Sequence, residues 1–456
     1  MSDQINDADD AYALDNQLIH AIREAIAGSD AERIAELFEP MHSADIADTL
    51  EQMDDAQRRE VIWLAPHVVD GDVLSDMDEG VREDMLEYLP QEVLSNAVRD
   101  LESDDVVDLL EDLEEEQQEA ILEVLEEADR VAVEQSLSYP EETAGRLMQR
   151  EVVWVPEHWT VGNTIDQLRS TEDLPDQFYH VVLVDPSMTP IGQVTLGRLM
   201  SSKRSTKLTE IAEETFQVIP VTQHEDDVAY AFNQYHLISS PVVDEDERLI
   251  GVITIDDAMI VLDEVHEEDI MRLAGVGEGS LADRVFETTK QRFPWLAVNL
   301  VTAILASLVI AQFEEAIAQL VALAVLMPIV ASMGGNAGTQ SLTVAVRAIA
   351  TKDLTGSNVW RVIRREVLVG LVNGIGFALV MGGVGWIWFG SFDLAYVIAA
   401  AMVINLVVAG LAGTVIPVLL ERMDIDPALA SGAFVTTVTD VVGFFAFLGL
   451  AVVILL

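Results

Sequence analysis

Residues 427–456 read PALASGAFVTTVTDVVGFFAFLGLAVVILL, and this stretch decides the fold class. It holds one charged residue, Asp440, and it exceeds the roughly 20 apolar residues that a helix needs to cross a bilayer core. Four further runs of this kind precede it, at 293–313, 316–346, 367–392 and 394–420. The sequence therefore predicts an all-α membrane domain of five helices over 293–456. Because 316–346 is too long for one straight span, we expect its GGNAG segment (334–338) to break the helix.

The charge of the chain lies almost entirely outside this membrane domain. Of 456 residues, 79 are acidic and 25 basic, for a net charge of −54, yet residues 293–456 hold only nine acids and six bases. So large an excess of acid excludes a nucleic-acid partner, because phosphate recognition needs basic surface. The chain has no cysteine, which excludes disulfides, thiolate metal sites and cysteine nucleophiles.

The basic residues near the apolar runs predict how the domain is oriented. They all fall on one side if five helices are threaded with the first entering from the cytoplasm. The opening MSDQINDADD has neither the basic nor the apolar region of a secretory signal. We therefore expect a multi-pass protein of the cytoplasmic membrane, with its amino terminus in the cytoplasm and its carboxyl terminus outside. The bases are Lys290, Arg292, Arg347, Lys352, Arg361, Arg364, Arg365 and Arg422.

The region before the membrane domain begins with short amphipathic helices. After an acidic tail (1–14), expected to be disordered, residues 15–142 show apolar stripes at helical spacing. HSADIADTLEQMDDAQRREV (42–61) matches ESDDVVDLLEDLEEEQQEAI (102–121) at an offset of 60 residues. Such a repeat of helical units predicts a small α-superhelical domain that binds or docks.

A second repeat follows, and it has the pattern of β/α units. Residues 143–206 and 207–263 each show a strand, a helix, a strand–turn–strand element and a closing helix. This tandem resembles a pair of CBS domains, modules that usually sense nucleotides or ions. Residues 264–292 then predict an acidic connecting helix and a linker into the membrane domain. The two repeats align at Pro156 and Pro220, Asp185 and Asp244, and Gly192 and Gly251.

Asp440 is the strongest candidate for a functional residue in the membrane domain. An ionised carboxylate near the bilayer centre is costly and usually faces a wet cavity or a cation. No Lys, Arg or His lies within the five apolar runs to pair with it. The alternative is an aspartate held by hydrogen bonds between helices, but the missing base favours a cation.

The segment PIVASMGGNAGTQ (328–340) is the second candidate. Its proline and glycines free backbone carbonyls, although close helix packing through small residues explains the glycines equally well. Asn336 and Gln340 add amide oxygens. Together with Asp440, the available ligands are hard oxygens, which suit Mg²⁺ or Ca²⁺, whereas zinc or copper calls for histidine or thiolate. The residues therefore predict passage of a hard divalent cation.

The order of these parts resembles the MgtE family of magnesium channels. The resemblance rests on ETAGRLM (142–148), GGNAG and TTVTDVVGF (436–444), and it covers nearly the whole chain. It implies a homodimeric, Mg²⁺-selective channel and no enzyme, with the pore between two subunits. The Asp of the last span holds hydrated Mg²⁺ in that family. The matching positions in this chain are Asp440, Asn336 and Thr436.

The family also implies that intracellular Mg²⁺ closes the channel. The ion would bind among cytosolic carboxylates, hold the helical domain against the CBS pair and let the connecting helix plug the pore. Where the family often has further acids, this chain has His236, Ile260 and Val265, so some ion sites are missing or shifted. The alternative for each carboxylate is a solvated surface residue, in keeping with adaptation to high salt. The matching positions are Asp72, Asp104, Asp108, Asp226, Asp257, Glu268, Asp269 and Asp426.

Two other functions stay open at this point. One is a channel of the same build for another divalent cation, such as Co²⁺ or Ca²⁺. The other is a membrane-anchored CBS sensor without transport, against which Asp440 argues, because a non-conducting anchor has no need of a charge there. The resemblance also allows an adenine nucleotide at the CBS pair, and no residue in the sequence decides whether one binds.

Overall fold

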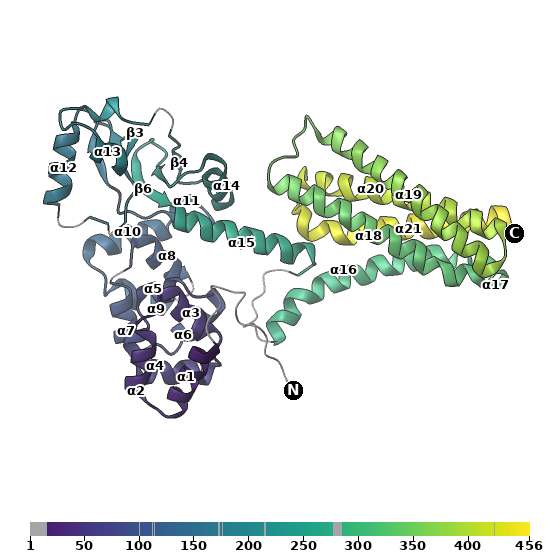
Figure 1. Cartoon of the computed structure of the whole chain (residues 1–456), viewed down its shortest axis with the longest axis horizontal. Helices are drawn as coiled ribbons and strands as arrows, with labels where there is room; N and C mark the ends of the chain where they lie inside the picture. The colour runs from purple at the N-terminus through teal and green to yellow at the C-terminus, as the bar shows by residue number, and fades with distance from the viewer. Residues whose placement is uncertain are drawn as a thin grey trace. The chain divides into compact units, whose positions relative to one another are not determined.

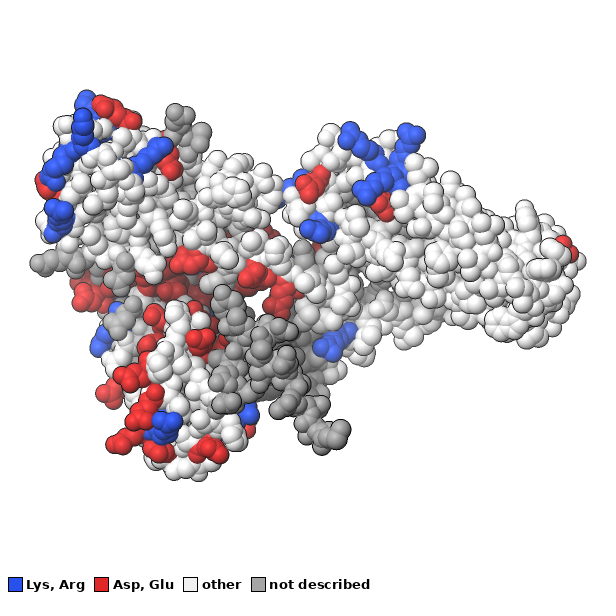
Figure 2. Space-filling model, viewed as in Figure 1, with Lys and Arg blue, Asp and Glu red and all other residues white. Residues whose placement is uncertain are grey.

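The computed structural model describes residues 16–99, 101–111, 113, 115–171, 174–175, 177–213, 216–276, 285–423 and 425–456. The chain divides into two compact units, 1–263 and 264–456 (Figure 1). Acidic side chains are spread over the helical part of the first unit, whereas the second is largely uncharged (Figure 2). The acidic tail expected at 1–14 lies outside the described residues.

The first unit begins with a domain of short helices, as the apolar spacing predicts. Ile22, Leu50 and Leu110 are fully buried in one core that runs through the domain. Helix α3 recurs as α8, and α4 as α9, at the 60-residue offset found in the sequence, which confirms the repeat. The helices are α1 (Asn16–Ala27), α2 (Ala31–Phe38), α3 (Ser43–Glu51), α4 (Asp55–Leu64), η1 (Pro66–Val68), α5 (Gly71–Ser75), α6 (Glu79–Leu86), α7 (Gln91–Ala97), α8 (Ser103–Glu111), α9 (Glu115–Leu122) and α10 (Glu127–Leu137).

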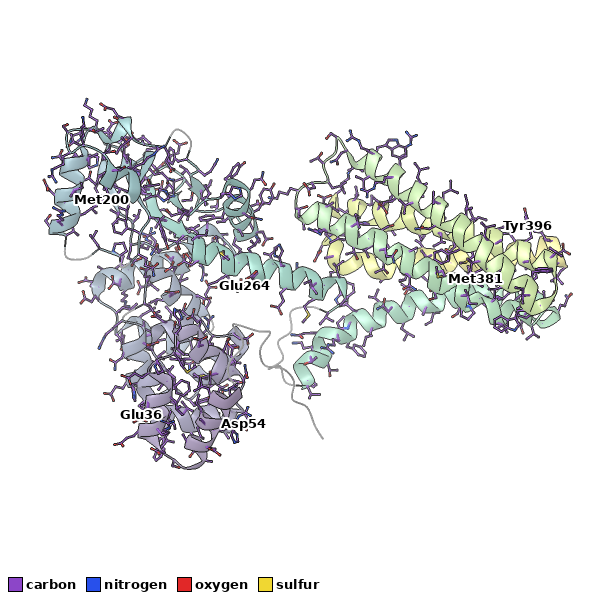
Figure 3. The ribbon with its side chains drawn as sticks, in the orientation of Figure 1. Glu36, Asp54, Met200, Glu264, Met381 and Tyr396 are labelled. Atoms are coloured by element: carbon purple, nitrogen blue, oxygen red, sulfur yellow. The ribbon has the colours of Figure 1, made fainter. Side chains whose placement is uncertain are left out.

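Aspartates begin several of these helices and account for part of the acidic excess. Asp54, labelled in Figure 3, accepts a hydrogen bond of 2.9 Å from the Gln57 N–H, and the Gln57 side chain accepts one from the Asp54 N–H. Asp30, Asp70 and Asp78 cap α2, α5 and α6 in a similar way. A carboxylate at a helix N-terminus satisfies a free N–H and complements the helix dipole. These four aspartates are therefore explained by the fold alone.

Each β/α repeat folds into a three-stranded sheet with the same order and directions. The first strand pairs in parallel with the second, and the second pairs antiparallel with the third. Gly192 lies opposite Leu183 and Gly251 opposite Val242, so the aligned glycines occupy equivalent positions. The elements are α11 (Ala144–Leu147), β1 (Trp154–Pro156), α12 (Val161–Ser170), β2 (His180–Val184), β3 (Pro190–Thr195) and α13 (Leu196–Ser201), then η2 (Leu208–Glu210), β4 (Ile219–Pro220), α14 (Glu225–Tyr235), β5 (Ser239–Val243) and β6 (Leu249–Thr254).

The two repeats pack against each other to form one body. Val182 and Val184 of β2 share a buried core with Leu249 of β6. The segment before β1 also joins the second repeat, since Gln149 and Val252 exchange backbone hydrogen bonds of 2.9 and 3.0 Å. Helix α15 (Ile255–Leu273) follows β6 without a loop and crosses from the first unit into the second.

The second unit contains, among its described residues, five helices long and apolar enough to cross a membrane, which confirms the predicted count. Ala316, Leu394 and Leu455 contribute to one core of the unit, and Val346 and Ala428 to another. The turns bearing Glu314, Glu315 and Asp393 therefore adjoin one core, while the basic connections adjoin the other. The helices are α16 (Val285–Ala311), α17 (Glu314–Gln319), α18 (Ala322–Ala350), α19 (Val359–Phe389), α20 (Phe392–Glu421) and α21 (Pro427–Leu455).

The expected break at GGNAG is wrong, because α18 runs through it without interruption. The long apolar run is divided earlier instead, between α17 and α18. The glycines serve close packing: Gly334 lies against the side chain of Asn405, and a Cβ on Gly338 would lie 2.6 Å from Val435 Cγ1. The alternative reading of this segment, small residues at a helix contact, is the one the structure supports.

Glycines also allow α19 and α20 to approach closely, and replacing one of them tests this helix contact. A Cβ on Gly410 would lie 2.6 Å from the backbone oxygen of Glu366, where neither atom can move aside easily. We expect Gly410→Ala to destabilise the membrane unit by about 1–3 kcal/mol. The matched control is Gly376→Ala in α19, where nothing lies within 4 Å of the added methyl group. Thermal unfolding in detergent should show a lower midpoint for the first variant. The control should show an equal or slightly higher midpoint than the wild type, because alanine favours a helix over glycine. Equal midpoints for the two variants would contradict this packing.

Candidate ion-binding sites

Asp440 and Thr436 lie one turn apart on α21, so both project from the same face. Asp440 is partly buried, and no hydrogen bond or ion pair to it occurs within the described residues. The hydroxyl of Thr436 donates to the Gly432 carbonyl at 2.9 Å. The alternative of an aspartate held by hydrogen bonds between helices therefore has no support in the single chain.

Helix α18 carries a polar stripe on its exposed face. Asn336 is exposed, and its amide nitrogen makes only a long hydrogen bond of 3.4 Å, to the Ser332 hydroxyl. The stripe comprises Ser332, Asn336, Thr339, Gln340 and Thr343, all of them exposed in the single chain. Amides exposed to lipid in the middle of a span are unfavourable, and such residues normally face protein or water. Within the described residues of the second unit this face of α18 is uncovered, so it is expected to face protein or water rather than lipid.

The two faces belong to neighbouring helices that pack closely. Gly338 of α18 lies against Val435 and Thr439 of α21, on the sides of the helices next to the polar stripe and Asp440. The structure thus places Asn336, Thr436 and Asp440 on adjoining helices, and it shows no direct contact between Asn336 and Asp440. Their oxygens are all hard donors.

A second group of carboxylates lies in the first unit, where α8 meets the CBS pair. Asp104 is 8 % exposed. Burial, together with the neighbouring Asp257, Asp105 and Glu102, raises the pKa of Asp104 well above its usual range. Burial and the nearby Glu151 raise the pKa of Glu102 to about 7. The negative charges are therefore close enough to oppose one another's ionisation.

Asp257 joins this group from the first turn of α15. Burial raises its pKa to about 7, against the opposing effect of a 2.8 Å hydrogen bond from the Thr254 hydroxyl. Burial also raises the pKa of Asp105, whose carboxylate accepts a 2.7 Å hydrogen bond from Ser75. We name Glu102, Asp104, Asp105 and Asp257 the carboxylate cluster. Within the part of the chain that the structure describes, no three acidic or histidine side chains are arranged to hold one metal ion directly.

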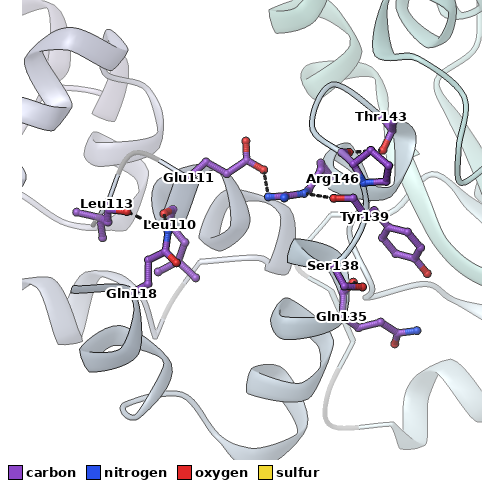
Figure 4. A network of polar contacts seen from close by, with 10 residues as sticks. Leu110, Glu111, Leu113, Gln118, Gln135, Ser138, Tyr139, Thr143 and Arg146 are labelled. Atoms are coloured by element: carbon purple, nitrogen blue, oxygen red, sulfur yellow. Dashed lines mark hydrogen bonds and ion pairs between the residues drawn. The ribbon is translucent and has the colours of Figure 1, made fainter. Parts of the chain in front are cut away.

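A polar network beside the cluster connects the helical domain to the CBS pair (Figure 4). Arg146, from the ETAGRLM segment, donates to Glu111 of α8 at 2.5 Å and to the Tyr139 carbonyl at 2.8 Å. Gln149 donates to Glu102 at 2.5 Å, and Ser103 donates to Glu151 at 2.7 Å. Residues 146–151, which begin within ETAGRLM, therefore join the two domains of the first unit.

Comparison with known families finds matches in the helical domain, in both β/α repeats and in the membrane unit. The model "MgtE: Divalent cation transporter" matches 327–450, the MgtE intracellular N domain matches 41–142, and the CBS domain matches 144–204 and 208–264. The chain is 34% identical over 319 residues to the magnesium transporter MgtE of Enterococcus faecalis, with 70% of each chain covered. The chain belongs to the MgtE family.

Two further proteins are similar to this chain. The magnesium transporter MgtE of Thermus thermophilus is 32% identical over 328 residues, which cover 71% of this chain and 72% of that one. A crystal structure of the cytosolic domain of the Mg²⁺ channel MgtE in complex with ATP is 26% identical, with a TM-score of 0.49, over 53% of this chain and 99% of that one. The family is one of magnesium transporters with CBS domains, so its members act in transport.

The remaining residues matched to MgtE regulatory positions are dispersed. Asp108 forms an ion pair of 2.6 Å with the buried guanidinium of Arg82. Asp72 lies in the first turn of α5, close enough to influence Asp105. Asp226 is exposed near His224, at 3.7 Å. Asp72 and Asp108 thus both lie near the carboxylate cluster, since each raises the pKa of Asp105.

Glu268 and Asp426 are brought together in the second unit by an arginine that the sequence analysis did not single out. Arg272 pairs with Glu268 one turn earlier on α15 and with Asp426 at 3.3 Å. Asp426 also caps α21 through a 2.7 Å hydrogen bond from the Ala428 N–H. The i, i+4 spacing of Glu268 and Arg272 was the available signal. The side chain of Asp269 lies outside the described residues.

Asn405 is a further residue that sequence reasoning missed. It is fully buried in α20, and its amide nitrogen donates to the Val330 carbonyl of α18 at 2.8 Å. Gly334 of α18 and Gly443 of α21 both lie against this amide. A lone asparagine within an apolar run was its only sequence signal. Asn405 thus fixes the spacing of the two helices that carry Asn336 and Asp440.

The raised pKa values give the first unit of this MgtE protein a predictable dependence on pH. The unfolded chain releases these protons near pH 4, whereas folded Glu102 and Asp257 retain them to about pH 7. The folded state therefore binds more protons in between, and its stability falls as pH rises through that window. Without divalent cations, we expect the thermal unfolding midpoint to decrease from pH 5 to pH 8. Added Mg²⁺ should restore most of the decrease in the unfolding midpoint at pH 8. A midpoint that rises with pH would contradict the raised pKa values of the carboxylate cluster.

Proposed function

We propose that this MgtE-family protein is a homodimeric channel that admits Mg²⁺ to the cytoplasm and closes as cytosolic Mg²⁺ rises. The observation that carries the proposal is the exposed polar stripe of α18 beside Asp440 of α21. A second copy related by a two-fold axis would cover these faces and enclose a polar path between them.

Charge and ligand chemistry support a divalent ion in that path. Two copies would supply two Asp440 carboxylates, which together balance one doubly charged cation. Asn336 and the backbone at Thr436 would add neutral oxygens. Mg²⁺ keeps several of its waters and needs few carboxylates, so a hydrated ion fits this small donor set.

The distribution of bases supports an orientation with the amino terminus in the cytoplasm. The arginines lie at the end of α18, at the start of α19 and directly after α20, and the opposite turns carry only acids. Basic connections lie on the cytoplasmic side in most membrane proteins. The carboxyl terminus would then lie outside.

The carboxylate cluster supports a regulatory role for Mg²⁺. Glu102, Asp104 and Asp105 belong to the helical domain, and Asp257 begins α15. A bound, partly hydrated Mg²⁺ would relieve the repulsion among them and favour the closed junction. The domains involved are 15–142, 143–206, 207–263 and the connecting segment 264–292, as the sequence predicts.

A pocket between the CBS repeats is the place we propose for an adenine nucleotide. Its lining includes Phe178, Tyr179 and Ser239. His180 also lines it, with its Nδ1 2.7 Å from the Ser239 hydroxyl. Aromatic rings and hydroxyls of this kind suit a nucleoside. Titration of the purified protein with ATP, read by tryptophan fluorescence, tests this part separately.

The test of transport is a flux assay with purified protein in liposomes that contain a Mg²⁺-sensitive dye. External Mg²⁺ supplies the only gradient. Uptake that stops once internal Mg²⁺ is raised supports both the channel and its regulation. Uptake that continues at high internal Mg²⁺ would contradict the proposed closure by Mg²⁺. Preferential uptake of Co²⁺ or Ca²⁺ would show that the transported ion is not Mg²⁺. Absence of flux at every internal concentration would favour a CBS sensor.

A further inference from the structure

The first two turns of α19 hold three arginines without an acidic partner. Arg361, Arg364 and Arg365 are exposed, and within the described chain no carboxylate forms an ion pair with them. The N-terminus of a helix carries a partial positive charge, which makes it an unfavourable place for cations. No acidic side chain among the described residues of this unit compensates for the arrangement, so we expect an external anion as the partner.

The same face of α19 continues as an apolar stripe. From Arg361, steps of three or four residues lead along the helix to Leu368, Val372, Ile375 and Leu379, so all lie on one side. Leu368 is 50 % exposed and Leu379 is 75 % exposed. One continuous helix face therefore begins with guanidinium groups and becomes apolar one turn later.

The residues around the start of α19 also suit a membrane–water boundary. Trp360, next to Arg361, is 76 % exposed, as is usual for aromatic residues at a membrane–water boundary. Arg347, in the last turn of α18, is exposed as well. Figure 2 shows basic side chains gathered around the connection between α18 and α19.

We propose that this face of α19 binds an anionic phospholipid. The phosphate lies among Arg361, Arg364 and Arg365, where charge-assisted hydrogen bonds from the guanidinium groups and the positive end of the helix dipole favour an anion. The acyl chains lie along the stripe that starts at Leu368. In the proposed orientation this lipid belongs to the cytoplasmic leaflet, and its binding does not depend on transport.

The apolar stripe distinguishes a lipid from the other available anion, the acidic first unit of the chain. An acidic protein surface would satisfy the arginines but would leave Leu368 and Val372 without a partner. A soluble phosphate ester would do the same. A phospholipid is the ligand whose charged and apolar parts match both ends of the face.

The test is native mass spectrometry of the full chain released from detergent, titrated with phosphatidylglycerol or with phosphatidylcholine of identical acyl chains. We expect phosphatidylglycerol to bind more tightly, and the double variant Arg361→Gln, Arg364→Gln to lose that preference. A base near an anionic headgroup contributes roughly a fivefold change in affinity, so the double variant should weaken binding roughly 30-fold. Phosphatidylcholine binding should not change.

Matched variants keep the result interpretable. Arg422→Gln removes an exposed base at the end of α20, where the helix dipole favours a cation, and should retain the preference. Arg361→Lys with Arg364→Lys keeps the charge and should retain most of it. Equal affinity of the wild-type chain for both lipids would overturn the proposal. Displacement of phosphatidylglycerol by an equal concentration of glycerol phosphate would also overturn it, because it would indicate a site for any phosphate.

Discussion

Asp440→Asn should reduce Mg²⁺ uptake into liposomes by on the order of 100-fold. A neutral amide of the same shape removes one charge per subunit from the path. A 100-fold loss corresponds to about 2.7 kcal/mol. This is less than the roughly 4 kcal/mol between two unit charges 4 Å apart at an effective dielectric constant of 20, as expected for an ion that keeps its waters. Asp440 is partly buried, and the described chain supplies it with no internal partner, so its removal should leave the packing intact. The measurement is the initial rate of dye response under an inward Mg²⁺ gradient.

Asp393→Asn is the matched control for this prediction. Asp393 is an exposed acid in the first turn of α20, at the end of the membrane unit opposite the basic connections. Its uptake should stay within a factor of about two of the wild type, because a surface charge at this distance is screened by salt. If Asp440→Ala also retains uptake, the assignment of the path to this face of α21 is wrong.

Asp104→Asn should have the second large effect, on regulation. Asp104 is nearly fully buried among other carboxylates, and a neutral amide removes the cost of a buried charge. Without divalent cations we expect the first unit to gain about 1–3 kcal/mol of stability. The stabilisation of the first unit by Mg²⁺ should decrease at the same time. The variant has one carboxylate ligand fewer, and it has less charge repulsion for the ion to relieve.

Two measurements on the full chain check this second prediction. Thermal unfolding with and without Mg²⁺ should show a smaller shift for the variant than for the wild type. Liposome uptake should continue at internal Mg²⁺ concentrations that stop the wild type. Asp129→Asn, an exposed acid of α10, should behave as the wild type in both. A variant that keeps the full Mg²⁺ shift would exclude Asp104 from the regulatory site.

The parts of the fold that depend on local pattern could be predicted from the sequence. Five apolar runs predict five helices because a bilayer sets a minimum length. The 60-residue offset predicts that α8 repeats α3 because equal local sequences favour equal local structure. Gly192 and Gly251 occupy equivalent positions for the same reason, since each lies in an antiparallel pair of strands close in sequence.

The parts that depend on distant contacts could not be predicted. Gly334 is compatible with a broken helix until Asn405, 71 residues later, is known to fill the space beside it. Asp108 resembled a free ligand because its partner, Arg82, lies 26 residues away. For the same reason a sequence with 70 acids before residue 293 cannot distinguish the capping Asp54 from the buried Asp104.

The uninterrupted course of α15 has a mechanical consequence. The helix starts at the last strand of the CBS pair and ends at Leu273, which packs beside Leu342 and Val346 of the membrane unit. At 1.5 Å per residue, Leu273 lies roughly 24 Å along the axis from Asp257. A stiff rod of that length acts as a lever, so a tilt of about 10° at the carboxylate cluster would carry its far end by roughly 4 Å. That displacement is close to the diameter of a helix backbone, roughly 4.6 Å, so a small tilt near Asp257 would be amplified along α15.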